Sequence, residues 1–271
     1  MKEEIKSAFF SKRFLLAFGL MMTCFLGYSL PSWIFSADWG DEFREGALQL
    51  SVGGIFFGSS MLLLPFCASV PYAISQVDEI RTSFLEWKVL RGSIRRYSFN
   101  KIVATMLSAA VATSMAFALH ALVWNFIAYP YDLVAHPYQE IPFSANCIYS
   151  NWTDIFYGFP IYLSMTLGIA FCAAIWSVTA LAVSVWVPDK LLTIIIPVCI
   201  YHLWSCRIFY HLFGINTPHP GALYNDALTV QRVWQSLVMY GILFIISLLV
   251  YVLGLKRRTQ NVWKEKNAAG T

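Results

Sequence analysis

Long stretches without any Asp, Glu, Lys or Arg divide this sequence and limit what it can fold into. A helix that crosses a bilayer needs about 20 mostly apolar residues. Strands of a membrane barrel would instead alternate apolar and polar residues in segments of about ten, and these stretches do not alternate. The sequence therefore predicts an all-α integral membrane protein, with a single domain over residues 1–271. We expect six transmembrane helices, at about residues 14–35, 48–74, 102–129, 158–187, 191–213 and 234–255.

The composition agrees with this prediction. Hydrophobic residues make up 58% of the chain and charged residues 13%, whereas about a quarter of an ordinary soluble domain is charged. This composition excludes a soluble enzyme, a disordered chain and a small disulfide scaffold. The net charge of +4 is too small to suggest a nucleic-acid partner.

The distribution of the basic residues predicts the orientation in the membrane. Most of the 19 Lys and Arg residues lie in the N-terminal segment, in the connection 76–101, at Lys190 and in the tail that follows Leu255. Lys and Arg favour the cytoplasmic side in short loops. We therefore expect a multi-pass protein of the cell membrane with both termini in the cytoplasm. The first apolar stretch is too long for the core of a cleaved signal peptide, so we interpret it as a retained anchor.

The connection between the second and third expected spans is the most informative segment. Val77, Ile80, Phe84 and Trp87 recur at helical spacing and form one apolar stripe, and Ser75-x-x-Asp78 has the spacing of a capping box. Two interpretations remain open. The helix lies on lipid, or it docks into a groove of a cytosolic protein. The mixed charges off the stripe favour a protein partner; they are Glu79, Arg81, Glu86 and Lys88.

The next helix has its own start signal. Ser93 is suited to begin it. Arg95, Arg96 and Lys101 then precede the third span, where we expect them at headgroup depth.

These features together resemble the permease subunit of the second type of ATP-binding-cassette (ABC) exporter. The run from Glu79 through Arg91-Gly-Ser-Ile-Arg-Arg-Tyr97 to Lys101 is similar to that family's pattern of an acidic residue, Gly-Ser/Arg, Tyr and Lys before the third span. The resemblance implies a permease homodimer that works with two copies of a separate cytosolic ATPase subunit, which would bind the ATP and Mg. It also implies that the connection contains a coupling helix that docks on this ATPase. The residues implied for docking are Glu79, Ile80, Arg81, Phe84, Glu86, Trp87 and Lys88.

The same resemblance implies a second cytoplasmic contact at the N-terminus. Ile5, Ala8, Phe9 and Lys12 have the spacing of a short amphipathic helix there.

No catalytic motif accompanies these features. The sequence lacks the G-x-x-x-x-G-K-[ST] phosphate loop, a G-x-S-x-G elbow and an H-E-x-x-H pair. We therefore expect a transport subunit without a cofactor or ATPase activity of its own. Its uncharged spans favour a hydrophobic or amphipathic cargo, such as a membrane-active peptide or a lipophilic drug. A membrane sensor or assembly factor is the alternative, and a membrane enzyme using outer groups such as Asp132, His136 or Glu140 is a third.

Two residues near the outer end of the fifth span are candidates for a substrate contact. Arg207 either reaches the outer headgroups or, with His211, contacts an anionic substrate or forms a gate.

Polar residues elsewhere in the spans have simpler explanations. Cys199, His202 and Cys206 share one helical face, but one helix supplies too few ligands, so we expect polar packing there and no metal. For His120 we expect an interhelical hydrogen bond.

Overall fold

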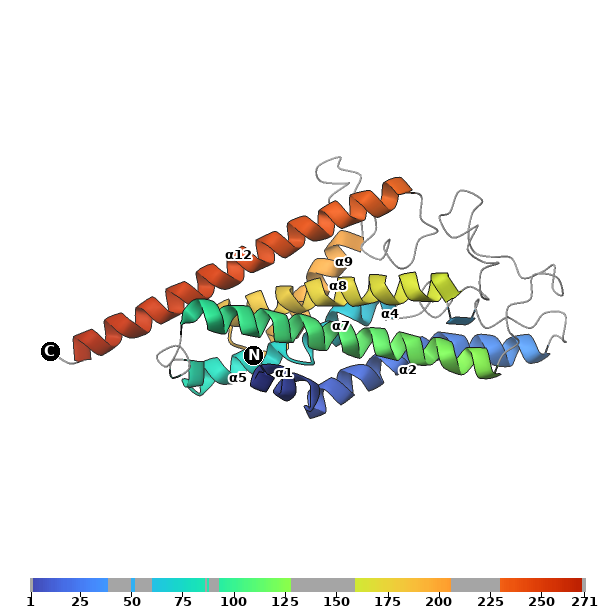
Figure 1. Ribbon diagram of the computed structural model, residues 1–271, viewed down its shortest axis with the longest axis horizontal. Coiled ribbons are helices and arrows are strands. Elements are labelled where there is room, and N and C mark those ends of the chain that lie inside the picture. Colours follow the sequence, from blue (N-terminus) through green and yellow to red (C-terminus); the bar gives the residue numbers. More distant parts are fainter. Residues whose placement is uncertain are drawn as a thin grey trace.

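The computed structural model describes residues 2–38, 50–51, 60–85, 87, 93–127, 159–205 and 230–269. All regular elements in these residues are α-helices (Figure 1). They are α1 (Lys2–Phe9), α2 (Lys12–Asp38), α4 (Ser60–Ser69), α5 (Ala73–Arg81), α7 (Ile94–Ile127), α8 (Phe159–Trp186), α9 (Lys190–Ser205) and α12 (Val230–Ala269).

Four helices in the described part combine the length and apolar composition needed to cross a membrane. Their spanning segments are Lys12–Ile34, Ile94–Ile127, Tyr162–Trp186 and Trp234–Gln260. These segments correspond to the first, third, fourth and sixth predicted spans and support an α-helical membrane protein. Of the second and fifth predicted spans, the described parts are shorter helices, the 10 residues of α4 and the 16 of α9. Six spans and the orientation of the termini remain predictions.

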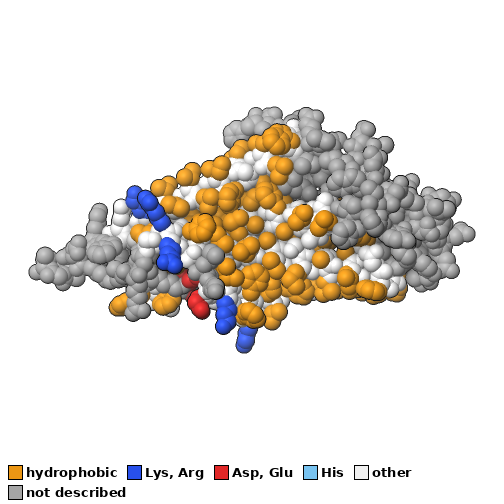
Figure 2. Space-filling model, viewed as in Figure 1, with side chains coloured by type: hydrophobic (Ala, Val, Ile, Leu, Met, Phe, Trp, Pro, Cys, Tyr) orange, Lys and Arg blue, Asp and Glu red, His pale blue; other side chains and the backbone are white. Residues whose placement is uncertain are grey.

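Helix α8 is the centre of the bundle. It packs against α7, α12, α4, α5 and α9. In the most apolar 18-residue stretch of α8, 78% is buried, whereas only 22% of the corresponding stretch of α12 is buried. Its Trp176 lies at the middle of an aromatic group with Tyr201, Trp204 and Tyr240. The outer helices therefore present apolar side chains outward, and Figure 2 shows them as a broad orange surface that ends where Lys and Arg gather.

Side-chain caps fix three of the helix starts. Ser11 Oγ accepts a hydrogen bond from the Phe14 backbone N–H at 3.1 Å and begins α2. Ser93 Oγ accepts one from the Arg96 N–H at 3.2 Å, as predicted, and begins α7. Asp189 Oδ1 accepts from the first turn of α9 in the same way. Such caps pair backbone donors that would otherwise lack a partner.

One predicted boundary is wrong. Ser75 does not begin a helix, because α5 starts at Ala73 and the Ser75 hydroxyl donates back to the Tyr72 carbonyl instead. Helix α7 begins at Ile94, directly after its predicted cap Ser93, and a capped helix accommodates charged residues in its first turns. Arg95, Arg96 and Lys101 are therefore part of α7.

Candidate functional site: a polar network around α5

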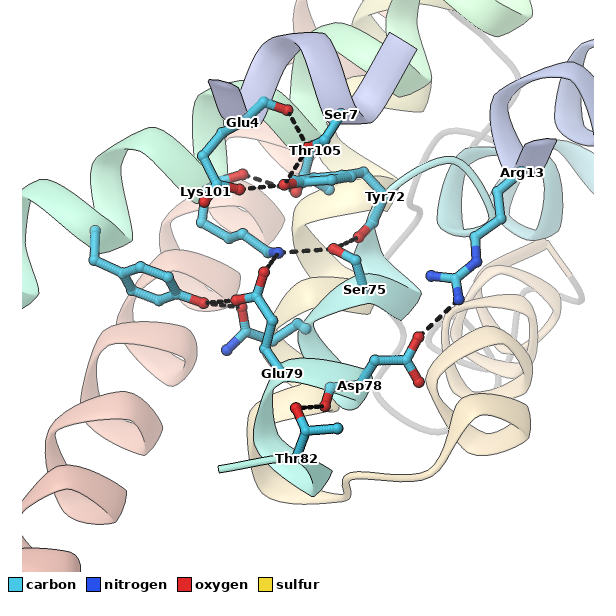
Figure 3. A network of polar contacts seen from close by, with 12 residues as sticks. Glu4, Ser7, Arg13, Tyr72, Ser75, Asp78, Glu79, Thr82, Lys101 and Thr105 are labelled. Carbon is cyan, nitrogen blue, oxygen red and sulfur yellow. Dashed lines mark hydrogen bonds and ion pairs between the residues drawn. The ribbon is translucent and has the colours of Figure 1, made fainter. Parts of the chain in front are cut away.

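A buried ion pair joins α5 to α7 at the basic end of the bundle (Figure 3). Lys101 Nζ lies 2.8 Å from Glu79 Oε1, with the lysine side chain fully buried and the glutamate 12% exposed. The ammonium also donates to Ser75 Oγ at 2.7 Å and lies 4.2 Å from the centroid of the Tyr72 ring. A buried lysine is stable only with such partners. Lys101 is therefore held inside the fold, in contact with α5.

Tyr97 extends this ion pair along α7. Its hydroxyl donates to Glu79 Oε2 and lies 2.8 Å from Gln76 Oε1. Tyr97 and Lys101 are one helical turn apart, so both reach the same carboxylate from one face of α7. The structure thus brings together Glu79, Tyr97 and Lys101, three residues of the segment 79–101 singled out in the sequence.

Helix α1 joins the network through Tyr72. The Tyr72 hydroxyl donates to a Glu4 carboxylate oxygen and lies 3.1 Å from Ser7 Oγ. Ala8 of α1 is fully buried beside Tyr72 and Ala104, with Ile5 packed on them. The short N-terminal helix expected from the sequence is present, and its apolar face contacts the chain's own helices.

A second carboxylate joins α5 to two further helices. Asp78 Oδ2 accepts from Arg13 of α2 at 2.7 Å, and Asp78 Oδ1 lies 2.7 Å from Lys190 Nζ of α9. Partial burial alone would raise the pKa of Asp78. The hydrogen bonds from Lys190 and Arg13 outweigh it and hold the pKa below its ordinary value.

Arg81 connects the end of α5 to the turn between α8 and α9. Its Nε donates to the Pro188 carbonyl at 2.8 Å, and its Nη2 lies 3.1 Å from Asp189 Oδ2. Backbone N–H donation from Leu192 and Leu191, together with the guanidinium of Arg81, holds the pKa of Asp189 below its ordinary value. Helix α5 is thus attached by polar side chains to α1, α2, α7, α9 and the α8–α9 turn.

The chain turns sharply after α5. Ser83 has a positive φ of 56°, a conformation that costs free energy for any residue with a Cβ. Leu85 is buried against α7, α8 and α12, while Phe84 is 50% and Trp87 60% exposed. The prediction of one continuous stripe is therefore wrong, because Val77 faces the core whereas the two aromatic rings face outward.

A groove lies beside Phe84, between α1 and α5. It has a volume of about 550 Å³, and its lining includes Phe84, Glu3, Glu4, Lys12 and Arg13. The groove is open on one side and carries both signs of charge. Such a surface can receive a polar segment of another protein.

The predicted docking residues divide into three groups. Glu79 and Ile80 turn toward the protein, and Arg81 pairs with Asp189. Phe84 and Trp87 point outward. Glu86 and Lys88, like the predicted outer contacts Arg207 and His211, lie outside the described residues.

Some members of the network could not be read from the sequence. Tyr72 and Glu4 carry no motif, and the capping-box spacing of Asp78 gave no sign of its ion pairs, so only contacts in the fold identify these residues.

His120 makes the interhelical contact expected from the sequence. Its Nε2 lies 2.9 Å from Ser29 Oγ of α2 and accepts from the Trp124 indole N–H at 2.9 Å. This buried triad attaches α2 to α7 far from the α5 network.

The part of the chain that the structure describes holds no group of three or more His, Cys, Asp or Glu side chains suited to a metal. Cys206 lies outside that part. No protein-family model matches the chain, and no curated protein or solved structure matches it either.

Proposed function

We propose that this chain is the membrane permease subunit of an ABC exporter of the second type. In this proposal it forms a homodimer in the cell membrane, with both termini in the cytoplasm. Two copies of a separate ATPase subunit supply ATP hydrolysis with Mg, and the permease itself catalyses no reaction. The cargo is a hydrophobic or amphipathic molecule, such as a membrane-active peptide or a lipophilic drug.

The attachment of α5 is the observation that supports this proposal most. A short charged helix stands between two apolar helices, α4 and α7, and its Glu79 is fixed to α7 by the buried Lys101. The two exposed rings of Phe84 and Trp87 follow directly in the chain. A protein that binds these rings would move α5, and the ion pairs of α5 would pass that displacement to the helices it contacts.

The charges of the network also support the proposal that this chain docks on an ATPase subunit. Glu79 and Asp78 are occupied by cations of the chain itself, so they serve to hold α5 in position. The outward surface left for a partner consists of Phe84 and Trp87 with the mixed-charge groove beside them. Exposed aromatic rings with a polar rim are typical of protein interfaces.

Purification of the tagged chain from its native membrane in mild detergent tests the proposal. We expect a co-purifying subunit that carries a phosphate loop and hydrolyses ATP. The double variant Phe84→Asp/Trp87→Asp should lose that subunit. Trp234→Asp is the matched control, since Trp234 is a 67% exposed ring at the start of α12, away from the groove and from the connection between α5 and α7. A folded chain that brings no ATPase, or a double variant that keeps it, would overturn this function.

A further inference from the structure

A second groove opens on the outer surface between α7 and α12. Both helices pack on α8 and diverge across it (Figure 1). The groove between them has a volume of about 490 Å³. Its walls are apolar, with Ile102 and Met106 from α7 and Phe244, Leu248 and Val252 from α12. Because both walls are membrane-spanning helices, this groove faces lipid.

The depth of the groove matches one leaflet of a bilayer. Its lining runs from Ile94 to Met106 on α7 and from Phe244 to Leu255 on α12. At the rise of an α-helix the two walls are about 18 Å and about 16 Å long, close to half of a hydrocarbon core of about 30 Å.

Cations flank one end of the groove from both helices. Arg95 belongs to the lining and is exposed. Lys256 is also exposed and lies one turn beyond Val252, on the same face of α12. The two basic ends coincide, since Ile94 of α7 and Leu255 of α12 pack in one apolar cluster. Among the described residues that line the groove there is no Asp or Glu.

We propose that this groove binds an anionic phospholipid, with an acyl chain between α7 and α12 and the phosphate between Arg95 and Lys256. The ligand must combine an apolar chain one leaflet long with a negative head, and a phospholipid has both. A guanidinium presents paired donors to a phosphate, and basic residues at a membrane surface favour anionic lipids. A zwitterionic headgroup would bring its own cation toward the cationic side chains of Arg95 and Lys256.

The same charges argue against a second copy of the chain in this groove. A two-fold interface places the same patch of both subunits face to face, which would bring the two sets of cations together. The proposal depends only on the chain being embedded in a membrane, and it does not depend on an ATPase partner.

Photo-crosslinking of the full chain in lipid nanodiscs tests this site. The probes are phosphatidylglycerol and phosphatidylcholine with the same photoreactive acyl chain, and mass spectrometry locates the labelled peptides. We expect labelling of both α7 and α12 in the stretches that line the groove. From two cations near an anionic head, we expect about a tenfold preference for phosphatidylglycerol.

Two sets of variants distinguish lipid bound at this site from contact with bulk lipid. Arg95→Gln/Lys256→Gln should reduce phosphatidylglycerol labelling to the phosphatidylcholine level, and Arg95→Lys/Lys256→Arg should preserve the preference. Val252→Trp fills the groove and should abolish labelling there, whereas Leu249→Trp, at a 57% exposed position outside the lining, should not. Labelling spread evenly over the outer helices would overturn the proposal. So would equal labelling by both lipids, or crosslinks between two copies of the chain in place of lipid.

Discussion

Lys101 of α7 and Glu79 of α5 form an ion pair in which the ammonium and the carboxylate oxygen lie 2.8 Å apart and the lysine is fully buried. Removing one partner leaves the other charge buried, which costs about 3–5 kcal/mol. Lys101→Met should therefore lower the thermal stability of the chain in mild detergent markedly. The double variant Lys101→Met/Glu79→Leu should recover most of it, because two apolar side chains replace the pair. Equal losses in the single and double variants would contradict this account.

Asp78 should make stability depend on pH in the acidic range. Its pKa is lowered in the folded chain by Lys190 and Arg13. A carboxyl whose pKa is lower in the folded than in the unfolded chain stabilises the fold when it is ionised. This stabilisation is complete above the unfolded pKa of about 3.9, and it is lost as the pH falls through the lower pKa of the folded chain. At pH 7 we expect Asp78→Asn to cost about 1 kcal/mol or less, because the pairs are partly exposed. The melting temperatures of the native chain and of Asp78→Asn should converge below about pH 4. A difference that stays constant with pH would contradict the assignment of this effect to Asp78.

Gly254 of α12 lies directly against Val185 and Trp186 of α8. A Cβ at this position would lie 2.6 Å from Trp186 Nε1 and 2.9 Å from Val185 Cγ1, and the Trp186 ring is held by a hydrogen bond to the Val250 carbonyl. Gly254→Ala should destabilise the packing of α12 on α8 by about 1–3 kcal/mol. Gly241→Ala is the matched control on the same helix, since nothing lies within 4 Å of its Cβ position. Thermal unfolding of the two variants in one detergent checks the difference, and equal melting temperatures would refute it.

His120 attaches α7 to α2 through Ser29. His120→Leu removes two hydrogen bonds, but the Trp124 indole N–H keeps Ser29 Oγ as an acceptor at 3.0 Å and the Ser29 hydroxyl keeps the Phe25 carbonyl, so we expect a loss of only about 1 kcal/mol. His120→Gln keeps polar atoms in the same place and should lose less. The measurement is again the melting temperature in detergent. A leucine variant as stable as the native chain would show that these hydrogen bonds contribute little.

The long apolar helices could be predicted because lipid requires uncharged stretches of a fixed length. A helix cap can be predicted where a polar residue precedes such a stretch. Of the three caps Ser11, Ser93 and Asp189, only Ser93 was predicted to begin a helix. The turn at Ser83 could not be predicted, because a positive φ is usually signalled by Gly or Asn. Local sequence carries no sign that the backbone reverses there.

Tertiary contacts account for the rest of what the sequence does not show. Glu79 and Lys101 are separated by a connection that reverses the chain, so no helical spacing relates them. The sequence placed Glu79 among the docking residues and Lys101 at headgroup depth, and neither pattern indicates that the two side chains form an ion pair inside the fold. The lipid-facing groove likewise arises from the divergence of α7 and α12 over α8, which depends on packing rather than on any motif.

Helix α12 has a mechanical property that follows from its length. It has 40 residues without a proline, which makes it about 60 Å long, twice the thickness of a hydrocarbon core. Its contacts with α8 run from Tyr240, which packs on Trp176, to Arg258, which donates to the Val185 carbonyl. Because these contacts extend over about 27 Å of the helix, α12 and α8 should tilt together, and the basic end of α12 should follow any displacement of its apolar part. Gly254 leaves room for the Trp186 ring at the basic end of this contact.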